Sequence, residues 1–111
     1  RVLRQLEDAE FIIIYGAGNY GQKSLRILDY QGMSSKILCF AISDENASGA
    51  VGKIPVRWID SLTEYRDRSV VVIGTVEHSK IYHVMRQHLT ELRFEHILNF
   101  YVLSQYFYFL V

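Results

Sequence analysis

The chain has 111 residues, half of them hydrophobic, and its 12 basic and 12 acidic residues give a net charge of zero. This composition argues against disorder, and the absence of any block of like charge gives no reason to expect a nucleic-acid partner. The length fits one domain, and the longest apolar run is too short to cross a bilayer, so we expect no membrane insertion. The single cysteine, Cys39, has apolar neighbours and predicts an inert core thiol in a cytoplasmic protein.

Helical and strand patterns alternate along the sequence. The apolar run over 11–15 is typical of a strand buried on both faces, whereas Pro55 suits an edge strand. Asp60 or Ser61 is placed to cap a short helix. In chain order we predict a lead-in helix over 1–10, a strand over 11–15, a helix over 19–31, strands over 36–43 and 54–59 separated by a loop over 44–52, a short helix to about residue 66, a strand over 69–73, a long amphipathic helix over 81–92 and a strand over 94–100.

This alternation predicts an α/β fold with right-handed crossovers. We expect a Rossmann-like doubly wound parallel sheet of about five strands, in the order 3-2-1-4-5, with helices on both faces. The switch point then lies between the strands that end at Tyr15 and Ile73. Residues 11–100 form the predicted nucleotide-binding domain.

An aromatic tail over 101–111 follows the predicted domain. Such an apolar run needs a covering surface. Either the tail packs on its own domain as a last helix or strand, or it contacts a following domain or a partner subunit in a homo-oligomer. The start at Arg1 rather than at methionine suggests a domain of a longer protein.

The most informative motif joins the first strand to the first helix. Gly16-x-Gly18-x-x-Gly21 stands directly between the apolar run and the helical pattern. This order is typical of a turn that binds a pyrophosphate. Gly16 allows the tight turn, Gly18 lets a phosphate approach the main chain, and Gly21 lets the helix pack closely on the strand.

Four further candidates share the predicted crevice. Asn19 and Tyr20 occupy the variable positions of the glycine turn, where Asn19 either donates to a phosphate or caps the helix. Gly74 and Thr75 follow the strand over 69–73, and Thr75 is also a candidate cap for the long helix. We therefore count all four as candidate cofactor-binding residues.

An acidic residue about 20 positions beyond the glycines binds the ribose in many dinucleotide sites. Asp44 lies 23 residues beyond Gly21, after the second strand, and either binds a ribose or caps its loop. Ser43 stands where an acid often closes that strand.

Catalytic and metal-binding patterns are not evident. His78, His83 and His88 are spaced by five residues, which places them about 140° apart around a helix, so they cannot converge on one ion. His88 lies on the apolar stripe and predicts a satisfied, half-buried histidine. No Tyr-x-x-x-Lys pair, Gly-x-Ser-x-Gly elbow or Walker lysine occurs, which favours a binding domain.

Three segments, 12–21, 40–56 and 70–73, together resemble the small Rossmann-like nucleotide-binding modules attached to bacterial glycosyltransferases and sugar-modifying transferases of surface-polysaccharide synthesis. The resemblance implies that Gly16, Gly18 and Gly21 hold a nucleotide-type small molecule, with a nucleotide-sugar or NAD(P) as the cofactor. Many relatives have an acidic residue where this chain has Ser43. This departure argues against NAD binding and leaves the choice between a nucleotide-sugar and no ligand. The alternatives are the cofactor half of an NAD-dependent dehydrogenase or epimerase, and a ligand-free interaction module.

Overall fold

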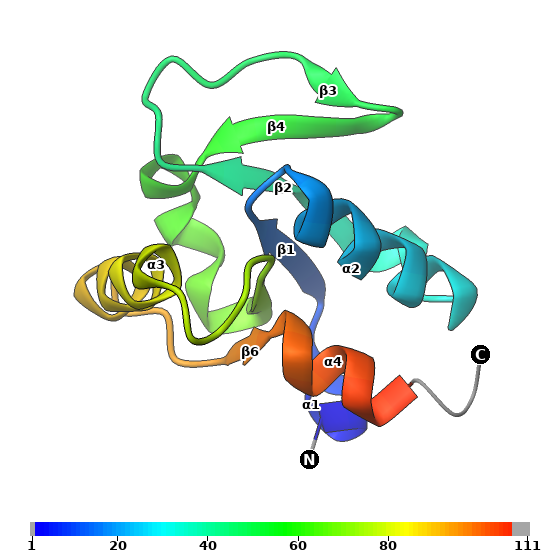
Figure 1. The fold of residues 1–111 in the computed structure, drawn as a ribbon. Helices are drawn as coiled ribbons and strands as arrows, with labels where there is room; N and C mark the ends of the chain where they lie inside the picture. Colours follow the sequence, from blue (N-terminus) through cyan, green and yellow to red (C-terminus); the bar gives the residue numbers. More distant parts are fainter. Residues whose placement is uncertain (1, 108–111) are drawn as a thin grey trace.

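The structure is a computed structural model that describes residues 2–107. Its elements alternate between helices and strands along the chain (Figure 1). In chain order they are α1 (Val2–Asp8), β1 (Phe11–Tyr15), α2 (Asn19–Tyr30), the 3₁₀ turn η1 (Ser34–Lys36), β2 (Ile37–Ile42), β3 (Ala50–Val51), β4 (Ile54–Trp58), the 3₁₀ segment η2 (Ile59–Arg68), β5 (Ser69–Ile73), α3 (Lys80–Glu91), β6 (Ile97–Asn99) and α4 (Phe100–Phe107). The α/β class predicted from the sequence is confirmed.

The sheet has six strands in the order β3-β4-β2-β1-β5-β6, so the predicted sheet of about five strands in the order 3-2-1-4-5 must be corrected by one added strand, β3, at the edge. The five strands expected from the sequence are β1, β2, β4, β5 and β6, and they keep their predicted relative order. The strands β4, β2, β1, β5 and β6 run parallel, and the added strand β3 pairs antiparallel with β4 at the edge. The sequence predicts a loop in place of β3, because a two-residue strand carries no periodicity. A turn at Gly52, whose φ is +61°, folds β3 back on β4.

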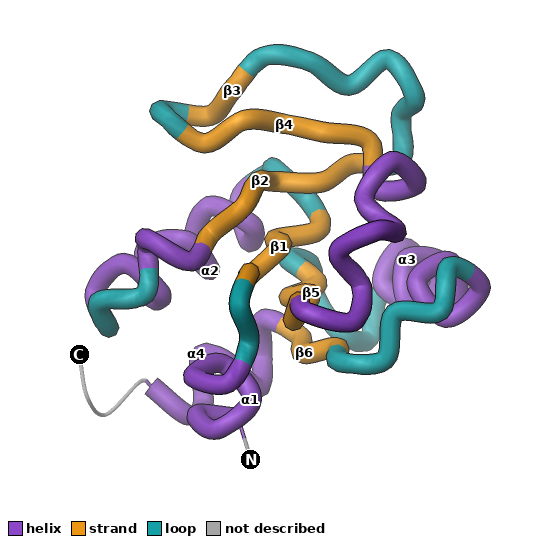
Figure 2. The backbone as a smooth tube through the Cα atoms, turned by 180° about the vertical axis from the view of Figure 1, so that it is seen from behind, coloured by secondary structure: helices purple, strands orange, loops and turns teal. Residues whose placement is uncertain are grey.

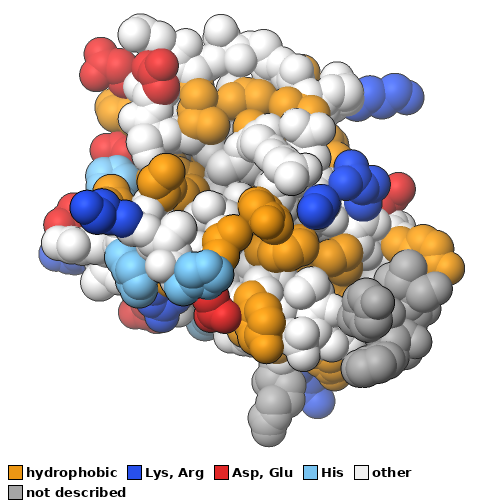
Figure 3. Space-filling model, in the orientation of Figure 1, with side chains coloured by type: hydrophobic (Ala, Val, Ile, Leu, Met, Phe, Trp, Pro, Cys, Tyr) orange, Lys and Arg blue, Asp and Glu red, His pale blue; other side chains and the backbone are white. Residues whose placement is uncertain are grey.

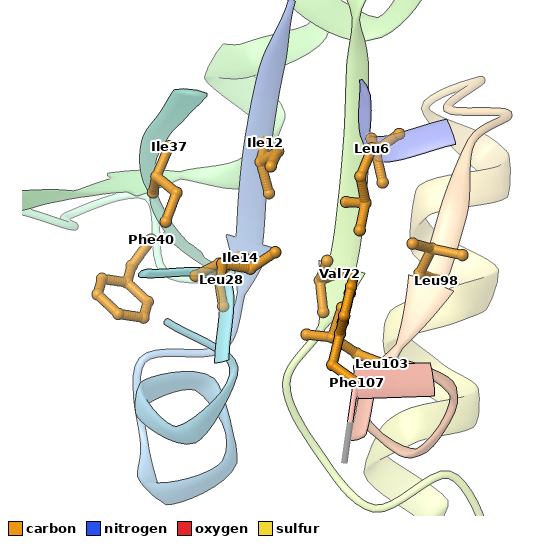
Figure 4. Packing of buried hydrophobic residues seen from close by; sticks show 11 residues of the cluster. Leu6, Ile12, Ile14, Leu28, Ile37, Phe40, Val72, Leu98, Leu103 and Phe107 are labelled. Atoms are coloured by element: carbon orange, nitrogen blue, oxygen red, sulfur yellow. The ribbon is translucent and has the colours of Figure 1, made fainter. Parts of the chain in front are cut away.

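Each face of the sheet packs on its own set of helices (Figure 1, Figure 2). Side chains alternate along a strand, so Ile12 and Ile14 of β1 face α2, whereas Ile13 and Tyr15 face η2 and α3. We call these sides the α2 face and the α3 face. Figure 4 shows the cluster on the α2 face, to which α1 and α4 also contribute side chains. The carboxyl ends of the parallel strands therefore lie between two helical layers.

The predicted last strand is shorter than expected, because α4 begins at Phe100. Leu103 and Phe107 are buried in the cluster on the α2 face, so residues 101–107 of the predicted tail pack on their own domain as a helix. Tyr101 and Tyr106 remain exposed on α4. The contact of this tail with a partner stays a prediction, and residues 108–111 lie outside the described part of the chain.

Candidate functional site

The glycine turn lies at the carboxyl end of β1, where the main chain leaves the sheet and enters α2. Gly16 has a φ of +113°, a conformation that L side chains rarely adopt. Its N–H donates to the carbonyl of Ala41 at 2.7 Å, which ties the turn to β2. The role predicted for Gly16, a tight turn, thus has a conformational cause.

Gly21 and Gly74 are required by packing rather than by a ligand. A Cβ atom added to Gly21 would lie 1.8 Å from the carbonyl oxygen of Gly16, and one added to Gly74 would lie 2.6 Å from Cα of Gly21. Three main-chain segments, from the ends of β1 and β5 and from α2, therefore meet without side chains between them. This contact brings α2 onto the sheet at the predicted switch point between β1 and β5.

Gly18 differs from the other glycines of the turn. Its backbone is extended, with φ −87° and ψ −151°, and no described heavy atom lies within 4 Å of a Cβ atom added there. It is the N-cap of α2 and offers no side chain to the first N–H groups, which have no partner within the helix. Neither conformation nor packing therefore requires glycine at this position.

Asn19 and Tyr20 are the first two residues of α2, so the prediction that Asn19 caps this helix is wrong: Gly18 is the cap. Asn19 is exposed, and its predicted contact with a phosphate stays a prediction. The ring of Tyr20 packs edge-on against Phe100 of α4, with centroids 5.1 Å apart, and Lys23 Nζ lies 5.1 Å from the Tyr20 centroid. Tyr20 thereby joins α2 to α4.

Asp44 and Thr75 are placed by two different turns. Asp44 Oδ1 accepts a hydrogen bond from the N–H of Asn46 at 2.8 Å, so the carboxylate caps its own loop, and its ribose contact stays a prediction. The prediction that Thr75 caps the long helix is wrong. Ser79 Oγ accepts the hydrogen bond from the N–H of Tyr82 at 3.0 Å, because a turn over 76–79 delays the start of α3.

A polar cleft of about 510 Å³ opens beside the glycine turn, on the α3 face. No motif in the sequence points to it, because its side chains come from four separate segments of the chain, at residues 15, 43–45, 58–60 and 84–91. The cleft is lined by Tyr15, Ser43, Trp58, Asp60, His88 and Glu91, together with neighbouring residues. On the side of the molecule seen in Figure 3, lysine and arginine side chains are scattered and form no continuous patch.

Tyr15 and Ser43 join the ends of β1 and β2 within this cleft. Their hydroxyl oxygens lie 2.6 Å apart. Burial raises the pKa of the Tyr15 hydroxyl; the hydrogen bond with Ser43 opposes this shift, and the charge of Asp60 adds to it. Tyr15 is therefore a neutral hydroxyl at physiological pH, and it holds the residue after β2 close to β1.

His88 joins α3 to η2, and its predicted half-buried, satisfied state is confirmed. Its Nε2 lies 2.7 Å from Oδ1 of Asp60, and its Nδ1 lies 3.6 Å from Oε1 of Glu91. Asp60 therefore pairs with a histidine, and the helix cap predicted for it is wrong: η2 has Trp58 as its N-cap. Because both ring nitrogens face carboxylates, His88 is placed to hold the cleft together rather than to accept a substrate proton.

Cys39 of β2 is fully buried on the α3 face, which confirms a core cysteine. Burial raises the pKa of its thiol to about 11, against a smaller opposing effect of Arg57. A thiol of such high pKa is a poor nucleophile. Among residues 2–107, no group of three or more His, Cys, Asp or Glu side chains is arranged to hold a metal ion.

No protein-family model matches the chain, and no curated protein is similar to it in sequence. In the part of the chain that the structure describes, no helix is long and apolar enough to cross a membrane.

Proposed function

We propose that this chain is a nucleotide- or nucleotide-sugar-binding accessory domain, in which the N-terminus of α2 binds a diphosphate. One observation carries the proposal. Gly18 has an ordinary extended backbone and open space where a side chain would lie, so the fold itself does not require glycine there. A phosphate that approaches the free N–H groups of α2 supplies the reason, because a side chain at this position would stand in its way.

The position of the turn supports the same function. It lies at the carboxyl edge of a mostly parallel sheet, beside the switch point between β1 and β5, where ligands bind in open α/β sheets. The resemblance to modules of surface-polysaccharide transferases extends the proposal to the class of enzyme that such a domain would serve. A buried, unpaired Cys39 accords with a cytoplasmic location.

Two substitutions of Gly18 test the diphosphate site. Gly18→Asp and Gly18→Asn both place a capping side chain at the N-terminus of α2, so both variants should be at least as stable as the wild type. The two side chains are nearly isosteric and differ in charge. We expect Gly18→Asn to weaken diphosphate binding and Gly18→Asp to abolish it. Since stability and affinity move in opposite directions, unfolding cannot explain the loss.

Calorimetric titration with UDP, UDP-glucose and NAD⁺ measures the affinity, with uridine as the control that lacks phosphate. A ligand at 100 times its Kd should also raise the free energy of unfolding by about 2.7 kcal/mol. Binding that Gly18→Asp leaves unchanged contradicts the α2 site, and no binding of any of the three ligands contradicts the function. A preference for NAD⁺ over both uridine nucleotides would favour the cofactor half of a dehydrogenase or epimerase.

A further inference from the structure

The cleft on the α3 face has a lining suited to a different chemical group from a phosphate. Three carboxylates, those of Glu45, Asp60 and Glu91, line it, and no lysine or arginine is among the described residues of its lining. Its volume of about 510 Å³ is within the range of small-molecule sites. Like charges would repel a phosphate there, so the cleft selects against the anion that the glycine turn attracts.

The groups in the cleft are instead complementary to hydroxyls. Carboxylate oxygens accept hydrogen bonds, and the hydroxyls of Tyr15 and Ser43 can accept or donate them. Trp58, at the end of β4, adds an aromatic surface on which the apolar side of a sugar ring can pack. We infer that this cleft binds a neutral polyhydroxyl ring, the sugar of a nucleotide ligand.

The acceptor on α3 is the carboxylate of Glu91, which lies near two side chains of the same helix. The two carboxylate oxygens of Glu91 lie 3.6 Å from Nδ1 of His88 and 3.4 Å from Nε2 of Gln87. The side chain of Glu91 nevertheless remains 62% exposed, so it can still accept a ligand hydroxyl.

A groove connects the cleft to the glycine turn. It has a volume of about 380 Å³, and Gly16 is among the residues that line it. The groove and the cleft share Tyr15, Ser43 and Val84. Ile81 of α3, which is 65% exposed, adds an apolar wall. A nucleotide whose diphosphate lies on α2 can therefore extend along the groove and place a sugar ring in the cleft, and this part of the inference rests on the proposed function.

Trp58 gives a direct test, because it is the only tryptophan of the chain and it lines the cleft. Its fluorescence is followed during titration with UDP, with UDP-glucose, UDP-galactose and UDP-N-acetylglucosamine, and with methyl α-glucoside, which has no phosphate. We expect at least one sugar-bearing ligand to change the emission. Glu91→Gln keeps the shape of the side chain but removes a charged acceptor. It should therefore lower the affinity for that ligand about tenfold.

The matched control is Glu95→Gln, the same change at an exposed residue outside the cleft, which should leave the affinity unchanged. If only UDP-sugars respond to Glu91→Gln, the hexose occupies the cleft; an equal response of UDP assigns the cleft to the ribose. Binding that Gly18→Asp abolishes but that neither changes Trp58 emission nor responds to Glu91→Gln overturns this inference alone. Methyl α-glucoside binding without nucleotide binding overturns the diphosphate site alone. No binding of any ligand overturns both.

Discussion

The two faces of the sheet differ in what they bring to its carboxyl edge. On the α2 face the buried cluster contains only aliphatic and phenylalanine side chains, and α2 begins at Gly18 with no side chain on its first N–H groups. On the α3 face the cluster includes Tyr15 and Cys39, and Ser79 closes the N-terminus of α3. One face offers main chain to a ligand, and the other offers side chains.

This difference separates two kinds of recognition at one edge. Helix N–H groups and the helix dipole bind an anion through the main chain, so the α2 face needs glycines and close packing. The α3 face uses Ser79 to satisfy its own helix, which leaves its carboxylates and hydroxyls to recognise uncharged donors. A ligand that carries both a diphosphate and a sugar matches the two faces together.

The largest effect should come from Gly21→Ala, which tests whether the α2 face depends on main-chain contact. The new Cβ would lie 1.8 Å from the carbonyl oxygen of Gly16, so the start of α2 must move away from the sheet. We expect a loss of about 3 kcal/mol or more in the free energy of unfolding, measured by urea denaturation.

Gly18→Ala is the control for this change, because its Cβ has open space. Alanine is a poorer N-cap than glycine, which lowers stability, but it also restricts the unfolded chain, which raises stability. Because these two effects oppose each other, the free energy of unfolding should change by less than about 1 kcal/mol. Equal stability of the Gly21 and Gly18 variants would contradict the distinction between a glycine required by packing and one that leaves space for a ligand.

A smaller effect should appear in alkali, and it should come from the α3 face. The thiol of Cys39 ionises near the ordinary thiol pKa of 9.0 when the chain is unfolded and near about 11 when it is folded. Between these values the unfolded chain releases a proton that the folded chain keeps, so raising the pH favours unfolding. Cys39 should therefore cost up to about 2–3 kcal/mol of stability across this window and nothing below it. The raised pKa of Tyr15 acts in the same direction above the ordinary tyrosine pKa of 10.0.

Urea denaturation at a series of pH values that spans the ordinary and the raised pKa of the thiol measures this slope in the wild type and in Cys39→Ala. The variant loses packing at every pH, so the comparison concerns the slope and not the absolute stability. We expect a flatter decline in the variant. Parallel curves would mean that the thiol ionises equally in both states.

The fold followed from the sequence where its signals are local. The apolar run over 11–15, the glycine turn and the amphipathic pattern of α3 each specify an element by the spacing of a few residues. The two-residue strand β3 was missed for the opposite reason: only its pairing with β4 defines it. The start of α3 was predicted to within one residue, but its cap was wrong: Thr75 and Ser79 are both favoured cap residues, and a turn between them makes Ser79 the cap.

The candidate site also has one part that the sequence reveals, the glycine motif, and one part that it does not, the cleft. The glycine motif could be found because its residues are neighbours in the chain, and the close packing predicted for Gly21 is confirmed. The sequence did not show that Gly74 packs against Gly21, or that packing leaves the glycine at position 18 unexplained. The cleft could not be found, because Ser43, Asp60 and His88 come together only when β2, η2 and α3 pack. The pairing of Asp60 with His88 across 28 positions leaves no local pattern.

The smallest effect should come from removing the capping side chain at the N-terminus of α3 and adding one at the N-terminus of α2. Ser79→Ala removes the acceptor of the Tyr82 N–H and should cost about 1 kcal/mol, whereas Ser79→Gly should cost only a few tenths. Gly18→Ser gives α2 an acceptor for its own third N–H group and should likewise gain about a few tenths of a kcal/mol. Urea denaturation measures both changes, and titration with UDP measures their consequence for binding. Only Gly18→Ser should lower the affinity for UDP. The serine side chain that caps α2 occupies the N–H groups that a diphosphate needs. A gain in stability without a loss of affinity would place the diphosphate elsewhere on the edge.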